Sequence, residues 1–372
     1  MLALTLRTFD RITELPVRRA LAAADIEIDG HRPWDIRVHD PAFFLRMMSN
    51  PAFQIGQTYM DGMWDCDAID ELLFRLIASG VGAQHEKGGV FYLRNALARI
   101  RNMQSRARAG EVALAHYDLD LDLYRGMLDE TLTYTCAYWD APGATLADAQ
   151  RAKLRLICDK LELKPGQTLL DIGCGFGGLA AFATEHYGVQ TLGITNSQQH
   201  CTVARTLYPH LEFARMDYRE LPALGRRFDA VASVEMIEAV GPKNFTTYFD
   251  VVDACLAPGG GFLLQSFISP ASRYVCNEWF DRYIFPNGVV PSFPQLHAAT
   301  QATFGAPADV HELGLHYPST LLAWDRNLRA TWPRLRSRND ERFRRMWHFY
   351  LTSLAGVFRA EDLRLCQVLY RK

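Results

Sequence analysis

The spacing of apolar residues changes part-way along the chain. From residue 154 onward, short apolar runs alternate with segments in which apolar residues recur every three or four positions. Buried strands are predicted at QTLLDIG (167–173), VQTLGIT (189–195), LEFARMD (211–217), FDAVASVEM (228–236) and GGGFLLQSFI (259–268). Because helices are predicted between these runs, the pattern favours an α/β fold with a doubly wound, Rossmann-like parallel sheet. Two further helices (320–332 and 341–358) and a last strand (363–372) are predicted beyond it.

The chain before this region has a different pattern. Short apolar segments alternate with turn-forming residues, and a helix is predicted at AIDELLFRLIASG (68–80). The segment 92–110 contains five arginines and no acidic residue. We therefore predict a small N-terminal α+β domain with a basic linker at 1–110, followed by an α/β domain with helical additions at 111–372.

Composition and charge narrow the classes of protein. With 372 residues, of which 49% are hydrophobic and 22% charged, the chain is long enough for two globular domains. A formal net charge of −2 gives no overall attraction to nucleic acid, so no nucleic-acid partner is expected. The eight cysteines show neither a CxxC pair nor zinc-ligand spacing. This favours free thiols in a reducing compartment and no metal site.

The N-terminal sequence and the lengths of the apolar runs indicate the cellular compartment of the protein. The apolar run at the start, MLALTLRTFDRITELPVRR, is too short for a signal peptide. No stretch approaches the roughly 20 apolar residues that cross a bilayer. We expect a cytoplasmic protein whose contact with lipid is peripheral, at the inner face of the membrane. The arginines of 92–110 would attract anionic lipid, but an ordinary solvated helix face carries similar charge runs.

A glycine-rich turn follows the first strand of the predicted sheet. The sequence LLDIGCGFGG (169–178) places Asp171, Gly173, Gly175 and Gly177 between a strand and a helix. Glycines at such a turn allow positive φ and let a ligand approach the backbone. An acidic residue before G-x-G is typical of S-adenosylmethionine sites, where the carboxylate lies near the methionine ammonium. A turn without a ligand is the alternative.

The next two strands supply further candidates for cofactor binding. The second strand ends in GITNSQQH without the acidic residue that commonly binds ribose hydroxyls, so Thr195 and Asn196 would take that place. After the third strand, MDYRE offers Asp217 and Tyr218 as contacts to the adenine edge. A solvated aspartate in a loop is an equally good explanation of Asp217.

Several longer segments carry a family resemblance. They are YTCAYWD (134–140), AQRAKLRLICDKLELKPGQTLLDIGCGFGGLA (149–180), VGPKNFTTYFDVVD (240–253), YIFPNG (283–288), TLLAWDRNL (320–328) and ERFRRMWHFYL (341–351). These segments resemble the cyclopropane-fatty-acid synthases, with the related mycolic-acid cyclopropane synthases and fatty-acid C-methyltransferases. QTYMDGMWDCDAIDELLFRLI (57–77) is similar to the small N-terminal domain of the bacterial synthases, so the resemblance extends over most of the chain.

The resemblance implies a reaction. Members of this family transfer the methyl group of S-adenosylmethionine to the double bond of an unsaturated fatty acyl chain of a phospholipid. A bound bicarbonate then takes a proton from the new methyl group, and the cyclopropane ring closes. Tyr134 and Thr135 are assigned to cofactor binding, and a homodimer is implied by the bacterial members.

In the family, a cysteine, a glutamate, a histidine and a tyrosine hold the bicarbonate. Cys136, Glu238 and Tyr317 match three of these positions, whereas Gln265 stands where the family has histidine. Ala239 replaces a second histidine after the glutamate. A glutamine donates a hydrogen bond but carries no charge and relays no proton. The open question is therefore ring closure, because a methylating enzyme without it would give a branched methyl or methylated-diene product.

Other interpretations remain. Cys136 alone would be a small buried hydrophobe and Glu238 a solvated carboxylate, and Gln265 would be a polar residue at a strand end. A methyltransferase acting on a small polar amine or hydroxyl would share the fold without needing an acyl pocket. A lipid- or cofactor-binding protein that has lost catalysis would keep the pocket. EWFDRYIF (278–285) and FRRMWHFYLTSLAGVF (343–358) are candidate walls of an acyl site.

Overall fold

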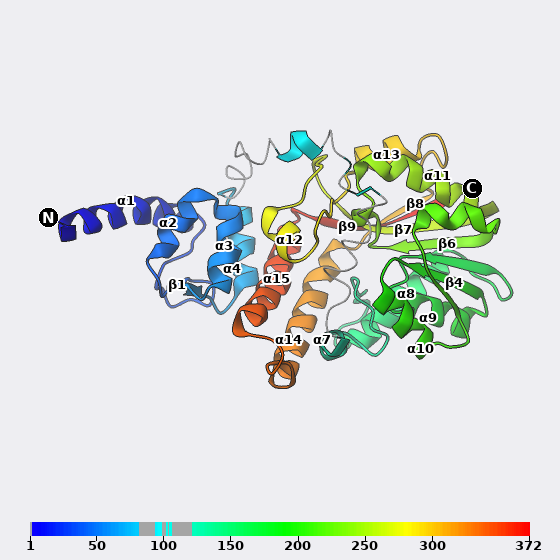
Figure 1. Cartoon of the computed structure of the whole chain (residues 1–372), viewed down its shortest axis with the longest axis horizontal. Coiled ribbons are helices and arrows are strands. Elements are labelled where there is room, and N and C mark those ends of the chain that lie inside the picture. Colours follow the sequence, from blue (N-terminus) through cyan, green and yellow to red (C-terminus); the bar gives the residue numbers. More distant parts are fainter. Residues whose placement is uncertain (1, 82–93, 99–101, 103, 106–120) are drawn as a thin grey trace.

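The computed structural model describes residues 2–81, 94–98, 102, 104, 105 and 121–372, with side chains from residue 13 onward. Figure 1 shows a helical N-terminal region at one end and a twisted sheet with its helices at the other. The predicted domain boundary at residue 110 and most of the arginine-rich segment lie outside the described residues. They stay predictions.

One large sheet organises the C-terminal region. Its strands, in the described part of the chain, have the order β5-β4-β3-β6-β7-β9-β8. They are β3 (Thr168–Ile172), β4 (Gln190–Thr195), β5 (Glu212–Arg215), β6 (Phe228–Val234), β7 (Leu256–Ile268), β8 (Asp309–Glu312) and β9 (Arg364–Arg371). Neighbouring strands from β5 to β7 are parallel, and the chain order reverses between β3 and β6. The α/β fold and each predicted strand are confirmed.

The sheet is mixed, which corrects the prediction of an all-parallel sheet. β9 runs antiparallel to both β7 and β8. The pattern of β9 shows that it is buried but does not show its direction. β8 was not predicted, because its sequence DVHE is short and polar and it lies at an exposed edge.

Helices cover both faces of the sheet. On one face, α8 (Leu146–Lys160) and α9 (Gly178–Tyr187) pack against Leu169, Ala230 and Leu263. On the other face, α11 (Phe245–Cys255) and α13 (Phe293–Thr300) pack against Leu170 and Val231. Successive residues of a strand point to opposite faces, so the continuous apolar runs of these strands match a sheet buried on both sides. α10 (Gln198–Leu207) packs on β4 and β5.

The N-terminal region is mainly helical. It contains α1 (Leu2–Ala23), α2 (Ala42–Ser49), α3 (Pro51–Met60) and α4 (Ile69–Ala78), together with a short antiparallel pair, β1 (Arg37–Val38) and β2 (Trp64–Asp65). α4 is the helix predicted at 68–80. The small α+β character is confirmed, although its β part is only this one pair within the described residues.

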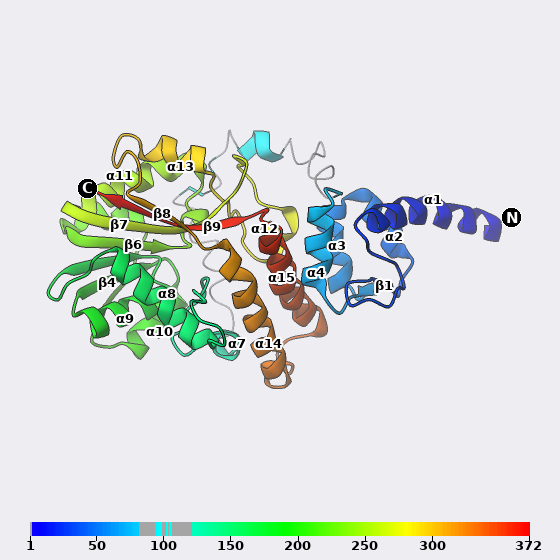
Figure 2. The same ribbon diagram turned by 180° about the vertical axis from the view of Figure 1, so that it is seen from behind.

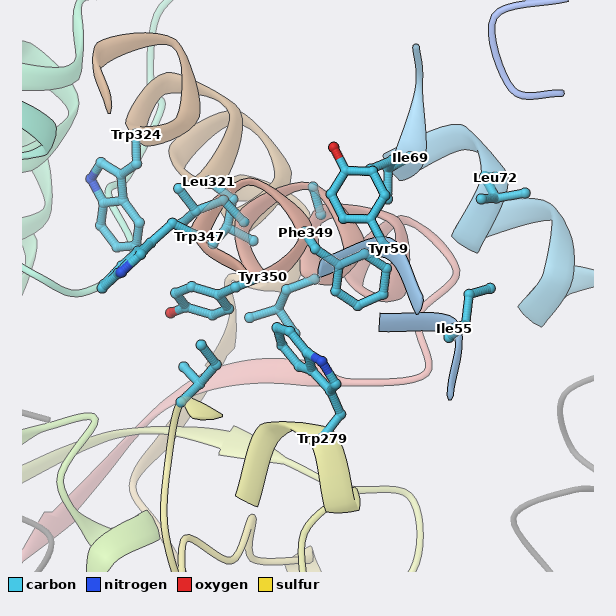
Figure 3. Packing of buried hydrophobic residues seen from close by; sticks show 14 of the residues in the cluster. Ile55, Tyr59, Ile69, Leu72, Trp279, Leu321, Trp324, Trp347, Phe349 and Tyr350 are labelled. Atoms are coloured by element: carbon cyan, nitrogen blue, oxygen red, sulfur yellow. The ribbon is translucent and has the colours of Figure 1, made fainter. Parts of the chain in front are cut away.

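Two long helices connect the N-terminal region to the sheet. α14 (Tyr317–Leu335) and α15 (Glu341–Arg359) lie side by side between them, next to α7 (Leu121–Met127) and α12 (Glu278–Tyr283), as the two opposite views show (Figures 1 and 2). α15 approaches α4 closely at Gly356, where an added Cβ would collide with the backbone oxygen of Asp70. Figure 3 shows the aromatic residues packed where α3, α12 and α15 meet, including Tyr59, Trp279 and Phe349.

This shared core places the N-terminal region behind one wall of a cavity in the C-terminal region. The ring centroids of Trp279 and Phe349 are 4.9 Å apart, and those of Tyr59 and Phe349 are 5.7 Å apart. Tyr350, the residue after Phe349, faces the cavity. None of the described helices combines the length and the apolar character needed to span a bilayer.

Candidate active site

A cavity of about 370 Å³ lies at the carboxyl ends of β3, β4 and β6. In a doubly wound sheet, ligands bind at this edge and next to the point where strand order reverses. The cavity reaches from the glycine-rich turn at one end to apolar side chains of α12 and α15 at the other. Of the predicted cofactor-binding residues, Tyr134, Thr135, Asp171, Gly173, Gly175, Thr195, Asn196, Asp217 and Tyr218 line it.

Asp171 provides a buried carboxyl group at the glycine-rich end. It lies on β3 opposite Gly193 of β4 and is 2% exposed. Its Oδ2 atom has no hydrogen-bond partner among the described residues. Burial raises the pKa of Asp171 to about 7, against the effect of the Lys153 cation. A buried carboxylate oxygen without a partner is costly, so this position fits a cationic group of a ligand.

The three glycines of the turn have different roles. Gly173, Gly175 and Gly177 all have positive φ, at 86°, 53° and 90°. A Cβ on Gly173 would meet Met236, and one on Gly177 would meet Phe213, so both are required by packing. A Cβ on Gly175 would meet no protein atom within 4 Å. Gly175 therefore leaves space in the cavity itself, whereas Gly177 lies at the N-terminus of α9 and supports the turn.

The ends of β4 and β5 form the next part of the wall. Thr195 accepts a hydrogen bond from the backbone N–H of Ser197 (3.2 Å), which leaves its hydroxyl hydrogen free to donate. Asp217 is paired with Arg219 at 3.0 Å and is therefore partly neutralised. Tyr218 is buried, and its hydroxyl has no hydrogen-bond partner in the described part of the structure. Tyr218 is thus better suited than Asp217 to meet a polar ligand edge.

The first two residues of the segment YTCAYW (134–139), Tyr134 and Thr135, line the cavity. The Tyr134 hydroxyl donates to that of Tyr350 at 3.0 Å. Thr135 accepts a hydrogen bond from Nζ of Lys153 at 2.9 Å. Burial lowers the pKa of Lys153 to about 8, although the carboxylates around it, Glu235 first, oppose that shift. Lys153 was not predicted, because a lysine in a helical pattern reads as solvent-exposed.

Glu238 lines the cavity, and only one of its two carboxylate oxygens has hydrogen-bond partners among the described residues. Its Oε1 accepts hydrogen bonds from the hydroxyl of Ser266 and the backbone N–H of Phe267, both at 2.8 Å. Its Oε2 has no hydrogen-bond partner in the described residues. Burial, together with the negative charge of the neighbouring Glu235, raises the pKa of Glu238 to about 7. This carboxyl group is therefore about half ionised near neutral pH.

The other three predicted catalytic residues converge on Glu235, which was not predicted. Oε1 of Glu235 accepts hydrogen bonds from the backbone N–H of Cys136 (3.0 Å) and from Nε2 of Gln265 (2.7 Å). Oε2 accepts one from the hydroxyl of Tyr317 (2.8 Å). Glu235 and Tyr317 line the cavity, whereas Cys136 and Gln265 are 1% and 0% exposed. The carboxylate of Glu235 thus accepts hydrogen bonds from three residues that were predicted to hold bicarbonate.

Each of these donors is itself held in place. Oε1 of Gln265 accepts a hydrogen bond from Gln367 (3.0 Å), which leaves the amide N–H₂ of Gln265 to face Glu235. The Tyr317 ring stacks on Phe358 at 4.5 Å. The loop that contains Cys136 is tied to α14, because Thr320 accepts from the backbone N–H of Ala137 (3.1 Å).

The thiol of Cys136 is not part of this contact. Burial raises the pKa of that thiol well above its usual value, so the thiol stays neutral. Cys136 contributes its backbone N–H instead. A sequence signal for Glu235 exists in retrospect, since a charged residue directly after a buried strand lies at the edge where doubly wound sheets bind ligands. Glu238 is three residues further on and matches the family motif, whereas Glu235 does not belong to that motif.

Comparison with known proteins identifies the family of the chain. The family model described as mycolic acid cyclopropane synthetase matches residues 104–368. The chain is 42% identical over 355 residues to the cyclopropane-fatty-acyl-phospholipid synthase of Escherichia coli strain K12, covering 95% of this chain and 91% of that protein. The chain belongs to the mycolic acid cyclopropane synthetase family. The predicted family is therefore confirmed.

Two other members of the family are informative. The tuberculostearic acid methyltransferase UfaA1 of Mycobacterium tuberculosis is 31% identical over 383 residues, covering 95% of this chain and 87% of that protein. Among solved structures, mycolic acid cyclopropane synthase CmaA1, complexed with SAH and CTAB, matches with a TM-score of 0.65 and 28% identity. It covers 71% of this chain and 98% of that chain.

In this member of the cyclopropane synthetase family, the end of the cavity away from the glycines is apolar. Phe280 and Phe285, from α12 and the loop after it, face Tyr350, Leu354 and Val357 of α15 across this end. Both wall segments predicted for an acyl chain supply some of these residues. Glu235 and Glu238, at and just after the end of β6, line the same cavity.

Proposed function

We propose that the protein transfers the methyl carbon of S-adenosylmethionine to the double bond of an unsaturated fatty acyl chain of a phospholipid. The observation that carries this proposal is the cavity itself, in which a polar end with Asp171 and Gly175 continues into an apolar end with two glutamates alongside. The names of the relatives support it, since one is a cyclopropane-fatty-acyl-phospholipid synthase. CmaA1, with its bound SAH, supports the cofactor.

The residues of the polar end fit the cofactor. The unpartnered Oδ2 of Asp171 suits the methionine ammonium, and the open side of Gly175 gives the ribose room to pass the backbone. When bound, S-adenosylmethionine supplies an electrophilic methyl group on a sulfonium. An alkene is a weak nucleophile, so alignment and the exclusion of water by the apolar wall are what the chain contributes.

Methyl transfer to an alkene leaves a carbocation on the acyl chain. The π faces of Tyr134 and Tyr350 and the partly ionised Glu238 stabilise a positive charge in this part of the cavity. A proton must then leave, and its acceptor is an oxyanion held by Cys136, Gln265 and Tyr317. The family resemblance names bicarbonate as that oxyanion.

Two products are consistent with this chemistry. Loss of a proton from the new methyl group closes a cyclopropane ring, as the relative from Escherichia coli is named for. Loss from a neighbouring carbon of the acyl chain gives a methyl-branched alkene instead. Two observations support this second product, namely Gln265 at the position of the family's histidine and the similarity to UfaA1. Cyclopropane formation is the main proposal.

The two products are distinguished with S-adenosylmethionine that carries a trideuterated methyl group. The purified protein is incubated with vesicles of unsaturated phospholipid, and the acyl chains are analysed by mass spectrometry. Ring closure retains two of the three deuterium atoms, whereas a branched methyl retains all three. Label transfer only to small amines or alcohols would contradict the proposed substrate class, and no label transfer to any acceptor would support a binding protein instead.

The substrate class implies contact with a membrane surface. We propose that the protein binds anionic bilayers peripherally and works as a homodimer, as the resemblance to the bacterial synthases implies. The arginine-rich segment is the candidate contact, but within its described residues Arg94 is engaged in ion pairs with Asp281 (2.7 Å) and Glu278 (3.6 Å). Co-sedimentation with vesicles of increasing anionic lipid content tests the contact, which should weaken with salt.

A further inference from the structure

The carboxyl group of Glu235 has the surroundings of a bound oxyanion. Three hydrogen-bond donors from three separate parts of the fold point to its two oxygens, and each is at 3.0 Å or less. The cation of Lys153 acts on it as well. Bicarbonate and a carboxylate share the same planar pair of oxygens, so any oxyanion bound by these donors would occupy the space that the Glu235 side chain fills.

The backbone at Glu235 is strained. Its φ is 53°, in the left-handed region that few residues other than glycine adopt. The backbone N–H of Glu235 donates to the carbonyl of Gln265 at 2.7 Å, which holds this turn in place. A glycine would adopt the same conformation without cost. Strained residues that persist are concentrated at functional sites, and here the strain aims a carboxylate into the cavity.

We propose that Glu235 is the proton acceptor of the reaction and stands in the place of bicarbonate, so that the protein turns over without bicarbonate. This inference rests on the proposed function and names the base of that same site. Glu235 lines the cavity beside Tyr317, while Gln265 and Cys136 are buried positioning residues that act through it.

The sulfonium methyl forms a bond to one alkene carbon, S-adenosylhomocysteine leaves, and the other alkene carbon becomes cationic. The carboxylate of Glu235 takes a proton from the new methyl group, and the released C–H electron pair closes the ring on the cationic carbon. For the branched product, the proton comes from the neighbouring chain carbon and the pair forms a double bond. Glu235 then returns its proton to solvent.

Burial supports this role from the energetic side. It raises the pKa of Glu235, although the hydrogen bonds from Cys136, Gln265 and Tyr317 and the charge of Lys153 oppose the shift. A base whose pKa lies nearer the working pH accepts a proton more readily than an ordinary solvated carboxylate. The neutral Gln265 strengthens this effect compared with a histidine, because a protonated histidine would stabilise the ionised form of Glu235.

The test compares turnover in buffer freed of carbon dioxide with turnover in added bicarbonate. Unsaturated phospholipid vesicles and labelled S-adenosylmethionine serve as substrates. We expect wild-type turnover to agree within about twofold in the two buffers. Glu235→Gly should lose about 100-fold or more, the usual contribution of a general base. Added bicarbonate should raise the turnover of Glu235→Gly at least about tenfold, because it enters the vacated space between the same donors.

Two further variants make the result specific. Glu235→Gln fills the space with an amide that accepts no proton, so we expect the same loss without rescue by bicarbonate. Glu235→Gly should fold at least as well as the wild type, because glycine relieves the strained φ, and thermal unfolding checks this. Both variants should bind S-adenosylmethionine with unchanged affinity in calorimetric titrations.

Wild-type turnover that depends on bicarbonate would overturn the inference, as would full activity of Glu235→Gln. A binding measurement separates this failure from failure of the proposed function. ¹³C-bicarbonate should show saturable binding by NMR to Glu235→Gly with S-adenosylhomocysteine present, and none to the wild type. Saturable binding to the wild type would contradict the role of Glu235 even if no lipid were turned over, and absence of lipid turnover alone would contradict only the proposed function.

Discussion

The two ends of the cavity are built in different ways. The cofactor end comes mainly from consecutive elements, with the β3–α9 turn, the end of β4 and the end of β5 all within residues 171–218. The proton-acceptor end brings together residues that are far apart, since Cys136, Gln265 and Tyr317 are 99, 30 and 82 positions from Glu235. The first end is a local motif, whereas the second exists only in the folded chain.

The difference also concerns what each end requires of its residues. At the cofactor end, the main requirement is empty space and a free oxygen, as at Gly175 and Asp171. At the other end, each hydrogen-bonding group must have its partner. Both oxygens of Glu235 accept hydrogen bonds, and its donors are held in turn by further residues such as Gln367. We therefore expect substitutions at the first end to change affinity and those at the second to change turnover.

The largest expected effect tests the cofactor end. Gly175→Val places a branched side chain in open space that the ribose would use, so affinity for S-adenosylmethionine should fall by about 100-fold or more, equivalent to about 3 kcal/mol. Isothermal titration calorimetry measures it. Positive φ is unfavourable for valine and should also lower the stability of the fold by about 1–2 kcal/mol.

Gly225→Val is the matched control for that strain. Gly225 has a φ of 63°, also has no atom within 4 Å of an added Cβ, and is exposed after the short helix at Tyr218–Leu224. It should lose similar stability and keep its affinity. Equal affinity of folded Gly175→Val and wild type would remove the turn from the cofactor site.

How far the sequence predicts each end follows from this difference. Asp171 and Gly175 lie in a continuous motif after a buried strand, so local pattern was enough to place them at the cavity. Glu235 also follows a buried strand, but its partners belong to other elements, and no local pattern shows which of two nearby glutamates they meet. The resemblance named Cys136, Gln265 and Tyr317 as a group, but it did not show that they meet Glu235.

A similar limit applies to the fold. The parallel strands were predictable because their apolar runs are buried on both faces. The direction of β9 and the existence of β8 were not, because the first depends on how the chain returns across the sheet and the second is an exposed polar edge. α15 was predicted as a helix, while its position between the N-terminal region and the cavity depends on long-range contacts such as that of Gly356 with α4.

The next effect in size concerns the second glutamate of the catalytic end. Glu238→Gln removes a negative charge next to the developing cation while its amide oxygen keeps the contacts with Ser266 and Phe267. Turnover should fall by about 100-fold, as for other groups that stabilise charge in a transition state. Affinity for S-adenosylmethionine should stay within about twofold of the wild type. Equal loss of affinity and turnover would move Glu238 to the cofactor end.

The same variant assigns a pH dependence. The pKa of Glu238 is raised to about 7, so its charge is present above that pH and is lost as the pH falls through it. At saturating cofactor, wild-type turnover should therefore decline as the pH falls from 8 to 6. Glu235, Lys153 and Asp171 also titrate around this cavity, and only the part due to Glu238 should be missing in Glu238→Gln. A pH profile of the same shape in both proteins would exclude Glu238 as its source.

The smallest expected effect tests how strictly the catalytic end is held. Gln367 lies opposite Gln265 on β9 and donates to its side-chain oxygen, which is why the Gln265 amide turns its N–H₂ group to Glu235. Gln367→Met removes this donor at similar volume, and the Gln265 amide is then free to turn an oxygen toward the carboxylate. If the lost hydrogen bond contributes about 1 kcal/mol to the correct orientation of the Gln265 amide, turnover should fall about fivefold. Affinity for S-adenosylmethionine should not change, because Gln367 reaches the cavity only through Gln265 and Glu235.

Gln190→Met, at an exposed glutamine of β4, is the matched control and should leave turnover unchanged. Unchanged turnover in a stable Gln367→Met protein would mean that Gln265 keeps its orientation unaided, and a loss of affinity instead would mean that β9 shapes the cofactor end as well.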